Sequence, residues 1–468
     1  MATLGVGQHL LLLFFYFTLG FVFQFPEQTV RMHIIESFHV SPAYLSFVYG
    51  FVSIPWFFKP CYGFFSDTVP FCGYRRRSYI SLSSFLCGMC WITMAHSLES
   101  FTTIMSMLVA SSFCLCISDV ITDGMLVEYV KDEDEDRGGR LQSHVWAARA
   151  AGGLCASLAG PYVKVNVGIA WVFGLTAVCP LINSAAVWCL REHDATAQLE
   201  RTLRQTCVDL WQAYKTPRIL RMATFVFISG IMPSYYMSLV YYLQTQRHFS
   251  AVTFGYLDMT YNLSLLCGAL AFSVCCRRWN FRVILAICLV LQFLLRMAQL
   301  LLIFHINTRW DIPDVVFVAM ESVAFSLVGS IANMPIVILG AQLCPKGLES
   351  TFYASLMSIS NVAGALSSWC GAALTAYFHV THGSFDNLWK LVIVCNILGV
   401  LPILLVCQVP SSGEVRGDHE RIPLADPAYV TTEMVSLQQP NPSAPPATFL
   451  EEFESHFNPD TEKAPDVS

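Results

Sequence analysis

The sequence predicts an all-α membrane protein with twelve transmembrane helices in two six-helix bundles. Of its 468 residues, 55% are hydrophobic and only 13% are charged, whereas soluble domains carry roughly 25% charged residues. Apolar runs long enough to cross a bilayer, about 20 residues each, recur along the first 410 residues, and a polar segment divides them into six and six. This composition excludes a soluble enzyme, a nucleic-acid-binding protein and a disordered scaffold.

Each apolar run is expected to be a helix, because lipid offers no hydrogen-bond partner to an open backbone. The first run, Leu10–Phe25, lacks a basic leading region and a small-residue cleavage site, so we interpret it as a first helix and not as a signal peptide. The predicted spans are 9–30, 43–66, 78–98, 101–129, 141–162, 168–190, 219–244, 251–275, 282–304, 313–342, 348–378 and 388–408.

The basic residues predict the orientation of these spans, because cytoplasmic loops carry an excess of Lys and Arg. The loops after even-numbered spans hold clusters such as Arg75–Arg77. The loops after odd-numbered spans hold little beyond Lys164, Arg247, Arg309 and Lys390. Both termini are therefore predicted to be cytoplasmic.

The chain divides into four parts. Residues 1–190 form the predicted N-terminal bundle, 191–218 a cytoplasmic linker with helix-like spacing, and 219–409 the C-terminal bundle. The tail, 410–468, carries nine prolines and a net charge of −8, compared with −6 for the whole chain. Such a segment buries too little apolar surface to offset its chain entropy, so we expect it to be disordered.

Ionisable residues inside the spans are candidates for function, because charge at membrane depth is costly. Lys59 lies in the second span, Asp119 and Asp123 in the fourth, and Arg149 in the fifth. At the rise of an α-helix, all four lie roughly 10–15 Å from the cytoplasmic ends of their helices. Two acids and two bases at one depth can pair around a central cavity, with Trp56 and Gln142 as further candidate contacts.

A second, looser group lies toward the outer ends of the spans and comprises Asp258, Arg296 and Glu321. We expect the two groups to brace the inner and outer gates of an alternating-access carrier, although plain structural salt bridges are the competing interpretation. Glu27 and Arg31, at the outer end of the first span, are read either as a snorkelling pair or as part of a gate.

Proline and small residues predict helix breaks and close helix contacts. Breaks are expected at Pro55, Pro60 and Pro335, since proline removes a backbone donor. The small residues of Ala150–Gly153 and Gly364–Ala365 allow helices to approach closely.

The same residues carry a family resemblance. Four stretches resemble the folate–biopterin transporter family, whose members have the major facilitator fold: Lys59–Asp67 followed by Gly73–Arg77, Ser118–Glu128, Trp146–Gly153, and Leu343–Thr351 followed by Ser360–Asn361. The resemblance spans about residues 10–408. It implies uptake of folates or pterins driven by a proton gradient, with Asp67, Arg76, Glu128 and Glu349 as gating or structural charges.

The resemblance also implies roles for the inner group. Asp119 or Asp123 would accept hydrogen bonds from the 2-amino edge of a pterin ring, and Trp56 would stack on the ring. Arg149 would bind the glutamate tail of folate in bidentate fashion with Lys59 as a point charge. The second acid would carry the proton. No metal and no cofactor are expected; the partners are a small-molecule substrate, a proton and the bilayer.

Two other functions remain open. Relatives similar to S-adenosylmethionine carriers make that solute, or another nucleoside-like one, the first alternative. A ligand sensor that does not transport is the second. An enzyme is not expected, because no nucleophile–base pair or phosphate loop occurs. The absence of an Arg- and Ser-rich transit peptide favours the plasma membrane over an organelle.

Overall fold

The described part of the chain consists of helices joined by turns and short irregular segments, and it contains no β-structure beyond two isolated bridges, Phe71–Tyr74 and Thr381–Ser384. The structure is a computed structural model and describes residues 5–132, 135–192, 203–276, 279–343 and 349–410. In these ranges, nine helical segments are long and apolar enough to cross a membrane by length and composition. The other three predicted spans, 43–66, 141–162 and 348–378, are also helical over most of their described residues.

The N-terminal half has two long predicted spans that are each built from shorter helices. Its elements are α1 (Val6–Gln24), α2 (Glu27–Phe38), α3 (Pro42–Val52), the 3-10 turn η1 (Ile54–Phe58), α4 (Lys59–Thr68), α5 (Arg77–His96), α6 (Phe101–Asp132), α7 (Glu135–Asn166), α8 (Ile169–Ala186) and η2 (Val187–Cys189). Inside this half α1 packs along α7, and α5 packs against α6 and α8.

The C-terminal half follows a short helix, α9 (Leu203–Lys215), which confirms the helical spacing predicted in the linker. Its elements are α10 (Pro217–Ile231), α11 (Tyr236–Thr245), α12 (Ala251–Ala271), the π-turn η3 (Phe272–Cys276), α13 (Phe281–Ile303), α14 (Ile306–Arg309), α15 (Asp314–Gln342), α16 (Glu349–Tyr377), α17 (Leu388–Val400) and η4 (Leu401–Gln408). Here α15 packs against α12 and α13, and α16 against α10.

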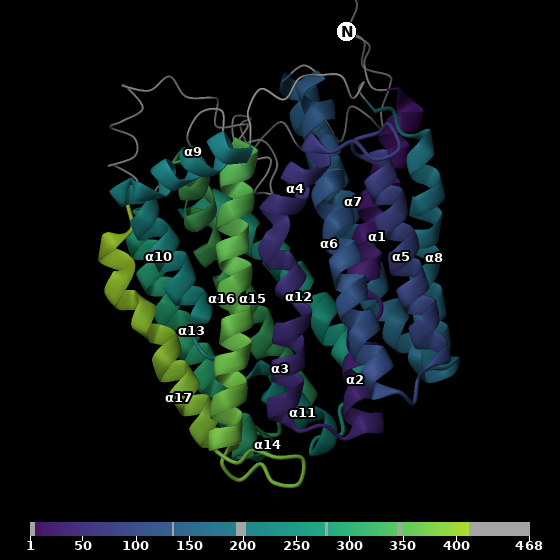
Figure 1. Cartoon of the computed structure of the whole chain (residues 1–468). Coiled ribbons are helices and arrows are strands. Elements are labelled where there is room, and N and C mark those ends of the chain that lie inside the picture. The colour runs from purple at the N-terminus through teal and green to yellow at the C-terminus, as the bar shows by residue number, and fades with distance from the viewer. Residues whose placement is uncertain (1–4, 133–134, 193–202, 277–278, 344–348, 411–468) are drawn as a thin grey trace, which may run out of the picture.

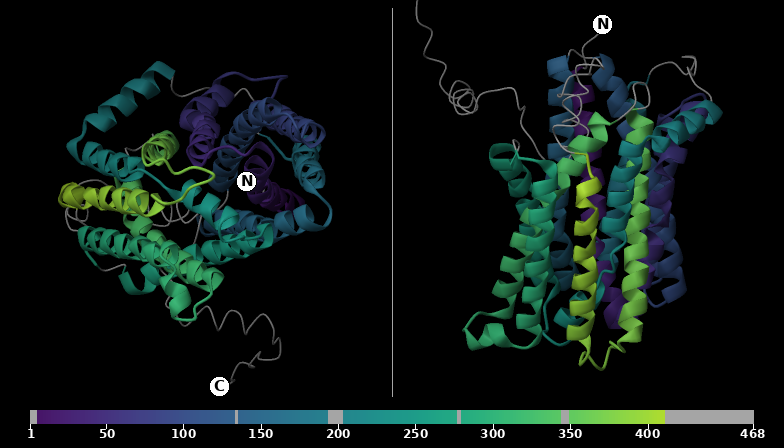
Figure 2. Two further views of the ribbon diagram at one scale, coloured as in Figure 1. Left: turned by 90° about the horizontal axis from the view of Figure 1, so that it is seen from below. Right: turned by 90° about the vertical axis from the view of Figure 1, so that its left-hand side faces the viewer.

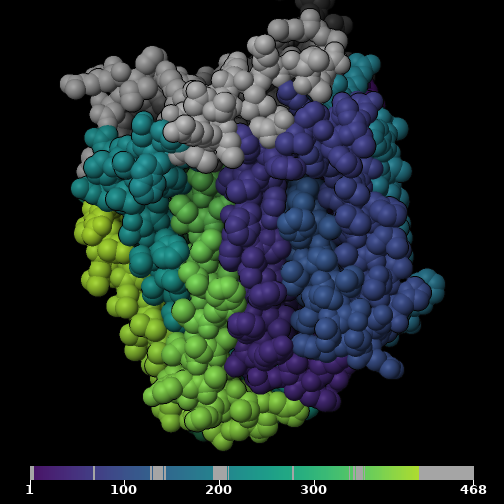
Figure 3. All heavy atoms as spheres, viewed as in Figure 1, coloured from purple at the N-terminus to yellow at the C-terminus, as the bar shows by residue number. Residues whose placement is uncertain are grey.

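The two halves lie side by side, with most long helices running between the end of the molecule that carries α9 and the end that carries α14 (Figures 1 and 2). Two seams join them: α3, η1 and α4 pack against α16, and α7 with α2 packs against α12. The first seam is visible as direct contact between the purple and green surfaces in Figure 3. Substrate sites in two-bundle transporters lie along such seams.

Local sequence explains where several helices begin. The Ser41 hydroxyl accepts a hydrogen bond from the Tyr44 amide at the start of α3, and the Ser250 hydroxyl caps α12 in the same way. The Asn280 side chain caps α13. Each cap satisfies a backbone donor that a helix start leaves free.

Proline acts differently at the positions where breaks were predicted. At Pro55 and Pro60 the prediction is confirmed, because α3 ends and a 3-10 turn precedes α4. At Pro335 it is wrong: α15 continues through the proline. A helix in lipid has no solvent to satisfy broken backbone bonds, so the loss of one donor costs less than a full break.

Candidate functional site

The Asp119 carboxylate on α6 binds two cations at once. Its Oδ1 lies 2.6 Å from Nη1 of Arg149 on α7, and its Oδ2 lies 3.1 Å from Nζ of Lys59 on α4. Asp119 is only 2% exposed. A buried carboxylate must be paired to offset its loss of hydration, and here three helices supply the ion pairs. The structure therefore brings together three of the four residues predicted for the inner group.

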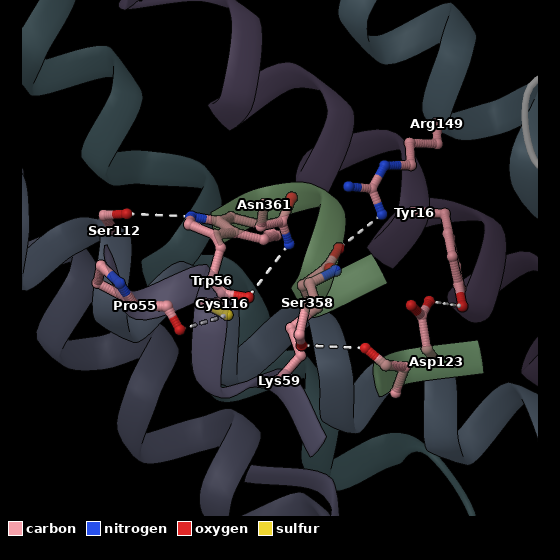
Figure 4. Close-up of polar contacts among 12 residues, drawn as sticks. Tyr16, Pro55, Trp56, Lys59, Ser112, Cys116, Asp123, Arg149, Ser358 and Asn361 are labelled. Atoms are coloured by element: carbon pink, nitrogen blue, oxygen red, sulfur yellow. Dashed lines mark hydrogen bonds and ion pairs between the residues drawn. The ribbon is translucent and has the colours of Figure 1, made fainter. Parts of the chain in front are cut away.

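The break between α3 and α4 places Lys59 in this site. The 3-10 turn that contains Pro55 ends at Phe58, and Lys59 is the first residue of α4. In the same turn Trp56 lies beneath the lysine, whose ammonium is 4.7 Å from the centre of the indole ring. The Trp56 indole N–H donates to Ser112 at 3.1 Å (Figure 4). Lys59 thus covers one face of Trp56, the residue that was predicted to stack on the substrate.

Asp123 lies one turn from Asp119 on α6 but contacts a different partner. It accepts a hydrogen bond of 2.8 Å from the Tyr16 hydroxyl of α1 (Figure 4). Tyr16 is fully buried and packs edge to face against Trp146, and the Arg149 guanidinium lies 5.2 Å from the centre of the Trp146 ring. The sequence interpretation missed Tyr16, because an aromatic residue in an apolar run carries no signal of its own.

Close packing of α1 on α7 holds Arg149 at this depth. Gly152 faces the main-chain carbonyl of Phe17, and Gly160 faces that of Phe25, so closely that a Cβ atom would overlap the oxygen. This confirms the predicted close contact for the Ala150–Gly153 segment. In the Gly364–Ala365 pair the close contact is made by Ala365, whose main-chain carbonyl lies 3.2 Å from the Cβ position of Gly50 on α3, whereas no atom lies within 4 Å of the Cβ position of Gly364.

The second predicted layer does not form one cluster. Asp258 on α12 accepts hydrogen bonds from the side-chain amides of Gln24, at 3.3 Å, and of Gln28, both in the other half. Arg31 pairs with Glu27 at 2.7 Å. The Asp258 carboxylate therefore points across the seam toward α1 and α2. Amide donors on these helices provide hydrogen bonds that offset the cost of burying the carboxylate away from water.

Arg31 closes the seam next to Asp258. Only 4% of its side chain is exposed, and its Nη1 donates to the Tyr236 hydroxyl of α11 at 3.3 Å. Its guanidinium also lies over the Tyr49 and Tyr236 rings, at 5.8 and 5.5 Å. These contacts join α2, α3 and α11, so Arg31 is buried between the halves and does not snorkel.

Arg296 and Glu321 remain inside the C-terminal half. The Arg296 guanidinium stacks on Phe325 at 4.5 Å from the ring centre and lines a cavity of about 350 Å³. Glu321 interacts with it electrostatically, but the described residues include no ion pair between them. A larger cavity of about 640 Å³ lies between α2 and α11, and its walls include Glu36 and Lys164.

Among the remaining predicted residues, only Arg76 has a side chain that the structure describes. The Arg76 side chain is buried against Gly124 of α6. The side chains of Asp67, Glu128, Gln142 and Glu349 lie outside the described part of the structure, as does the tail beyond residue 410.

Comparison with known proteins identifies the family. The model of the BT1 family matches residues 20–422. This chain belongs to the BT1 family. Among the relatives of this BT1 chain, the "Folate-biopterin transporter" of Synechocystis sp. is 33% identical over 403 residues, which cover 86% of this chain and 81% of the relative. "Probable folate-biopterin transporter 4" of Arabidopsis thaliana is 25% identical and covers 87% and 96%.

Solved structures show the fold of the BT1 chain. The nucleoside transporter NupG superposes with a TM-score of 0.66 at 11% identity, over 86% of this chain and 98% of NupG. An auto-inhibited peptide transporter of the POT family gives a TM-score of 0.61 at 13% identity, over 90% and 98%. At these identities the likeness shows the fold alone: a multi-pass integral membrane protein with the architecture of these transporters.

Proposed function

We propose that this BT1-family protein is a secondary active transporter that moves folate, biopterin or a related pterin across a membrane. The names of the relatives support this substrate class, and the transporter fold supports alternating access of the two halves. The observation that carries the proposal is the Asp119 carboxylate held by Lys59 and Arg149. Such charges at membrane depth mark substrate and ion pathways.

The balance of charge suggests how a proton is coupled. With both acids ionised, Lys59, Arg149, Asp119 and Asp123 sum to zero. A proton on Asp123 leaves the group with a net charge of +1, and an anionic substrate such as folate offsets this charge in the central path. Because net charge at this depth is costly, the protein changes conformation most readily with proton and anion both bound or both absent. Such joint movement of a proton and an anion in one direction is the property of a symporter.

The contacts of Asp119 change one assignment made from the sequence. Arg149 and Lys59 were expected to bind the glutamate tail of folate, but both already bind Asp119. A carboxylate that displaced Asp119 would leave that acid buried without a counter-ion, which is strongly unfavourable. We therefore propose that Asp119 keeps both cations in place, and that Asp123 carries the proton and contacts the pterin ring.

We further propose an orientation and a location. The end that carries α9 and Arg75–Arg77 would face the cytoplasm, because basic loops are retained there. On that orientation both termini are cytoplasmic and the Arg31–Tyr236 contact closes the outer side of the seam. The plasma membrane is the proposed location.

Uptake of labelled folate, biopterin and S-adenosylmethionine tests the proposal in cells expressing the full chain, with and without an uncoupler. We expect accumulation of a folate or pterin that the uncoupler abolishes. Uptake of S-adenosylmethionine alone would instead establish the alternative substrate class. Binding without accumulation in vesicles would establish a sensor.

A further inference from the structure

The cavity inside the C-terminal half is lined by an arginine that forms no ion pair within the described residues. Arg296 lies on α13 about 10 Å from the outer end of that helix. Its guanidinium lies over the Phe325 ring and interacts electrostatically with Glu321, but within the described residues it makes no hydrogen bond and no ion pair. A guanidinium at this depth normally faces a carboxylate or backbone carbonyls. The guanidinium therefore has hydrogen-bond donors that no described residue satisfies.

The cavity also contains buried polar atoms that lack partners. Asn396 is 2% exposed and lines the cavity, and its Oδ1 has no hydrogen-bond partner. The Ser229 hydroxyl, which also lines the cavity, is likewise buried and unpaired. Unpaired buried polar atoms cost free energy, so two of them in the same cavity as the Arg296 guanidinium indicate a site for a polar ligand.

The break between α10 and α11 forms another wall of the cavity. Residues 232–234 are not helical and line it, and the Met232 carbonyl accepts a hydrogen bond of 2.5 Å from Ser367 on α16. Interrupted helices near the middle of a membrane commonly border substrate sites in transporters. The cavity is thus a polar chamber at a helix break, with a volume of about 350 Å³, within the usual range of about 300–1,000 Å³ for ligand pockets.

Polar groups on α12 link Arg296 electrostatically to the seam between the halves. Tyr261 on α12 interacts electrostatically with both Arg296 and Asp258, and Asp258 accepts a hydrogen bond from Gln24 of α1. A ligand with its ring near the N-terminal ion cluster would therefore find a second, positively charged anchor in the opposite half.

We infer that the Arg296 cavity binds the carboxylate end of a folate-type substrate, with Arg296 as the anion-binding residue. This inference rests on the proposed transport of folates and pterins. It assigns a binding site to the carboxylate tail, which folate has and biopterin lacks. The guanidinium can hold a carboxylate in bidentate fashion, and Asn396 and Ser229 can bond its amide. Biopterin carries no carboxylate, so Arg296 would select folate over biopterin without affecting the recognition of the pterin ring.

Arg296→Gln tests the inference through substrate selectivity. We expect the KM for folate to rise about 10- to 100-fold, the range for loss of a charge-assisted contact, while biopterin uptake stays at the wild-type level. Biopterin uptake in the same cells also reports that the variant is folded and inserted. Arg296→Lys should give an intermediate KM, because lysine keeps the charge but loses the bidentate geometry. Arg309→Gln, an exposed arginine on α14, is the matched control and should change neither substrate.

Inhibition by p-aminobenzoylglutamate, which has the tail without the pterin, provides a second readout. We expect it to compete with folate in the wild type and to lose potency in Arg296→Gln. Equal losses of folate and biopterin uptake in a well-expressed Arg296→Gln variant would overturn the inference. The inference would also be overturned if, in reconstituted vesicles, the variant lost uptake of both substrates only when anionic lipid was present. The cavity would then bind a lipid headgroup. If the wild type takes up neither substrate, the proposed function itself fails.

Discussion

Gly20 of α1 lies directly against the main-chain carbonyl of Arg149 on α7. The same arginine holds the Asp119 carboxylate at 2.6 Å through its side chain. The distance between two helix backbones is therefore set at the residue that carries the charge. Because α1 can approach α7 this closely only at a residue without a side chain, Gly20 fixes the spacing of the two helices. The same contact therefore fixes the position of the Arg149–Asp119 ion pair.

Gly20→Ala should loosen this contact and weaken the site. The added Cβ would overlap the Arg149 carbonyl, and overpacking of this kind costs about 1–3 kcal/mol. We expect a lower melting temperature in detergent and reduced uptake of substrate. Gly364→Ala is the matched control, because nothing lies within 4 Å of its Cβ position and alanine favours a helix over glycine. Equal melting temperatures for the two variants would contradict this account.

Asp119→Asn should be strongly destabilising, because it leaves Lys59 and Arg149 without their shared counter-ion. Removing one partner of a buried pair costs about 3–5 kcal/mol, and partial exposure of the two cations places this site near the lower value. Thermal unfolding measures the loss. The double variant Asp119→Asn/Lys59→Met should recover part of the stability, since one uncompensated cation is removed. Failure of the second substitution to restore any stability would argue against the shared ion pair.

Asp123→Asn should abolish gradient-driven accumulation while leaving exchange of substrate across the membrane. The amide cannot take up and release the coupled proton. Uptake by the wild type should rise as the external pH falls, and uptake by the variant should not respond. Tyr16→Phe, which removes only the hydrogen bond to Asp123, should keep the response to pH. Full concentrative uptake by Asp123→Asn would remove this acid from the mechanism.

Glu192→Ala should destabilise the end of the N-terminal half that carries Arg75–Arg77. The Glu192 carboxylate accepts hydrogen bonds from the backbone amides of Arg75, Arg76 and Arg77, at 2.7, 2.8 and 3.1 Å. It therefore caps the start of α5, and loss of a helix cap costs about 0.5–2 kcal/mol. The melting temperature should fall relative to Glu99→Ala, a substitution at an exposed position. An unchanged melting temperature would show that water replaces the carboxylate without cost.

The ion cluster shows how far sequence patterns reach. Lys59, Asp119 and Arg149 could be found in advance, because a charge inside an apolar run is conspicuous and helical rise gives its depth. Their partners could not. Tyr16 resembles any aromatic residue of an apolar run, and Gln28 gives no sign that it reaches Asp258 in the other half. Pro335 illustrates the opposite case, a strong local signal that the surrounding helix overrides.

The sequence by itself determined that the chain is a helical membrane protein, where most spans run and which charges lie within them. Those properties follow from the exclusion of polar and charged groups from lipid, which acts on each segment separately. Only the tertiary structure decided that Asp119 holds two cations, that Asp258 turns toward the N-terminal half and that Arg296 faces a cavity. These outcomes depend on the rotation and spacing of helices distant in the chain, which close packing sets and local composition does not encode.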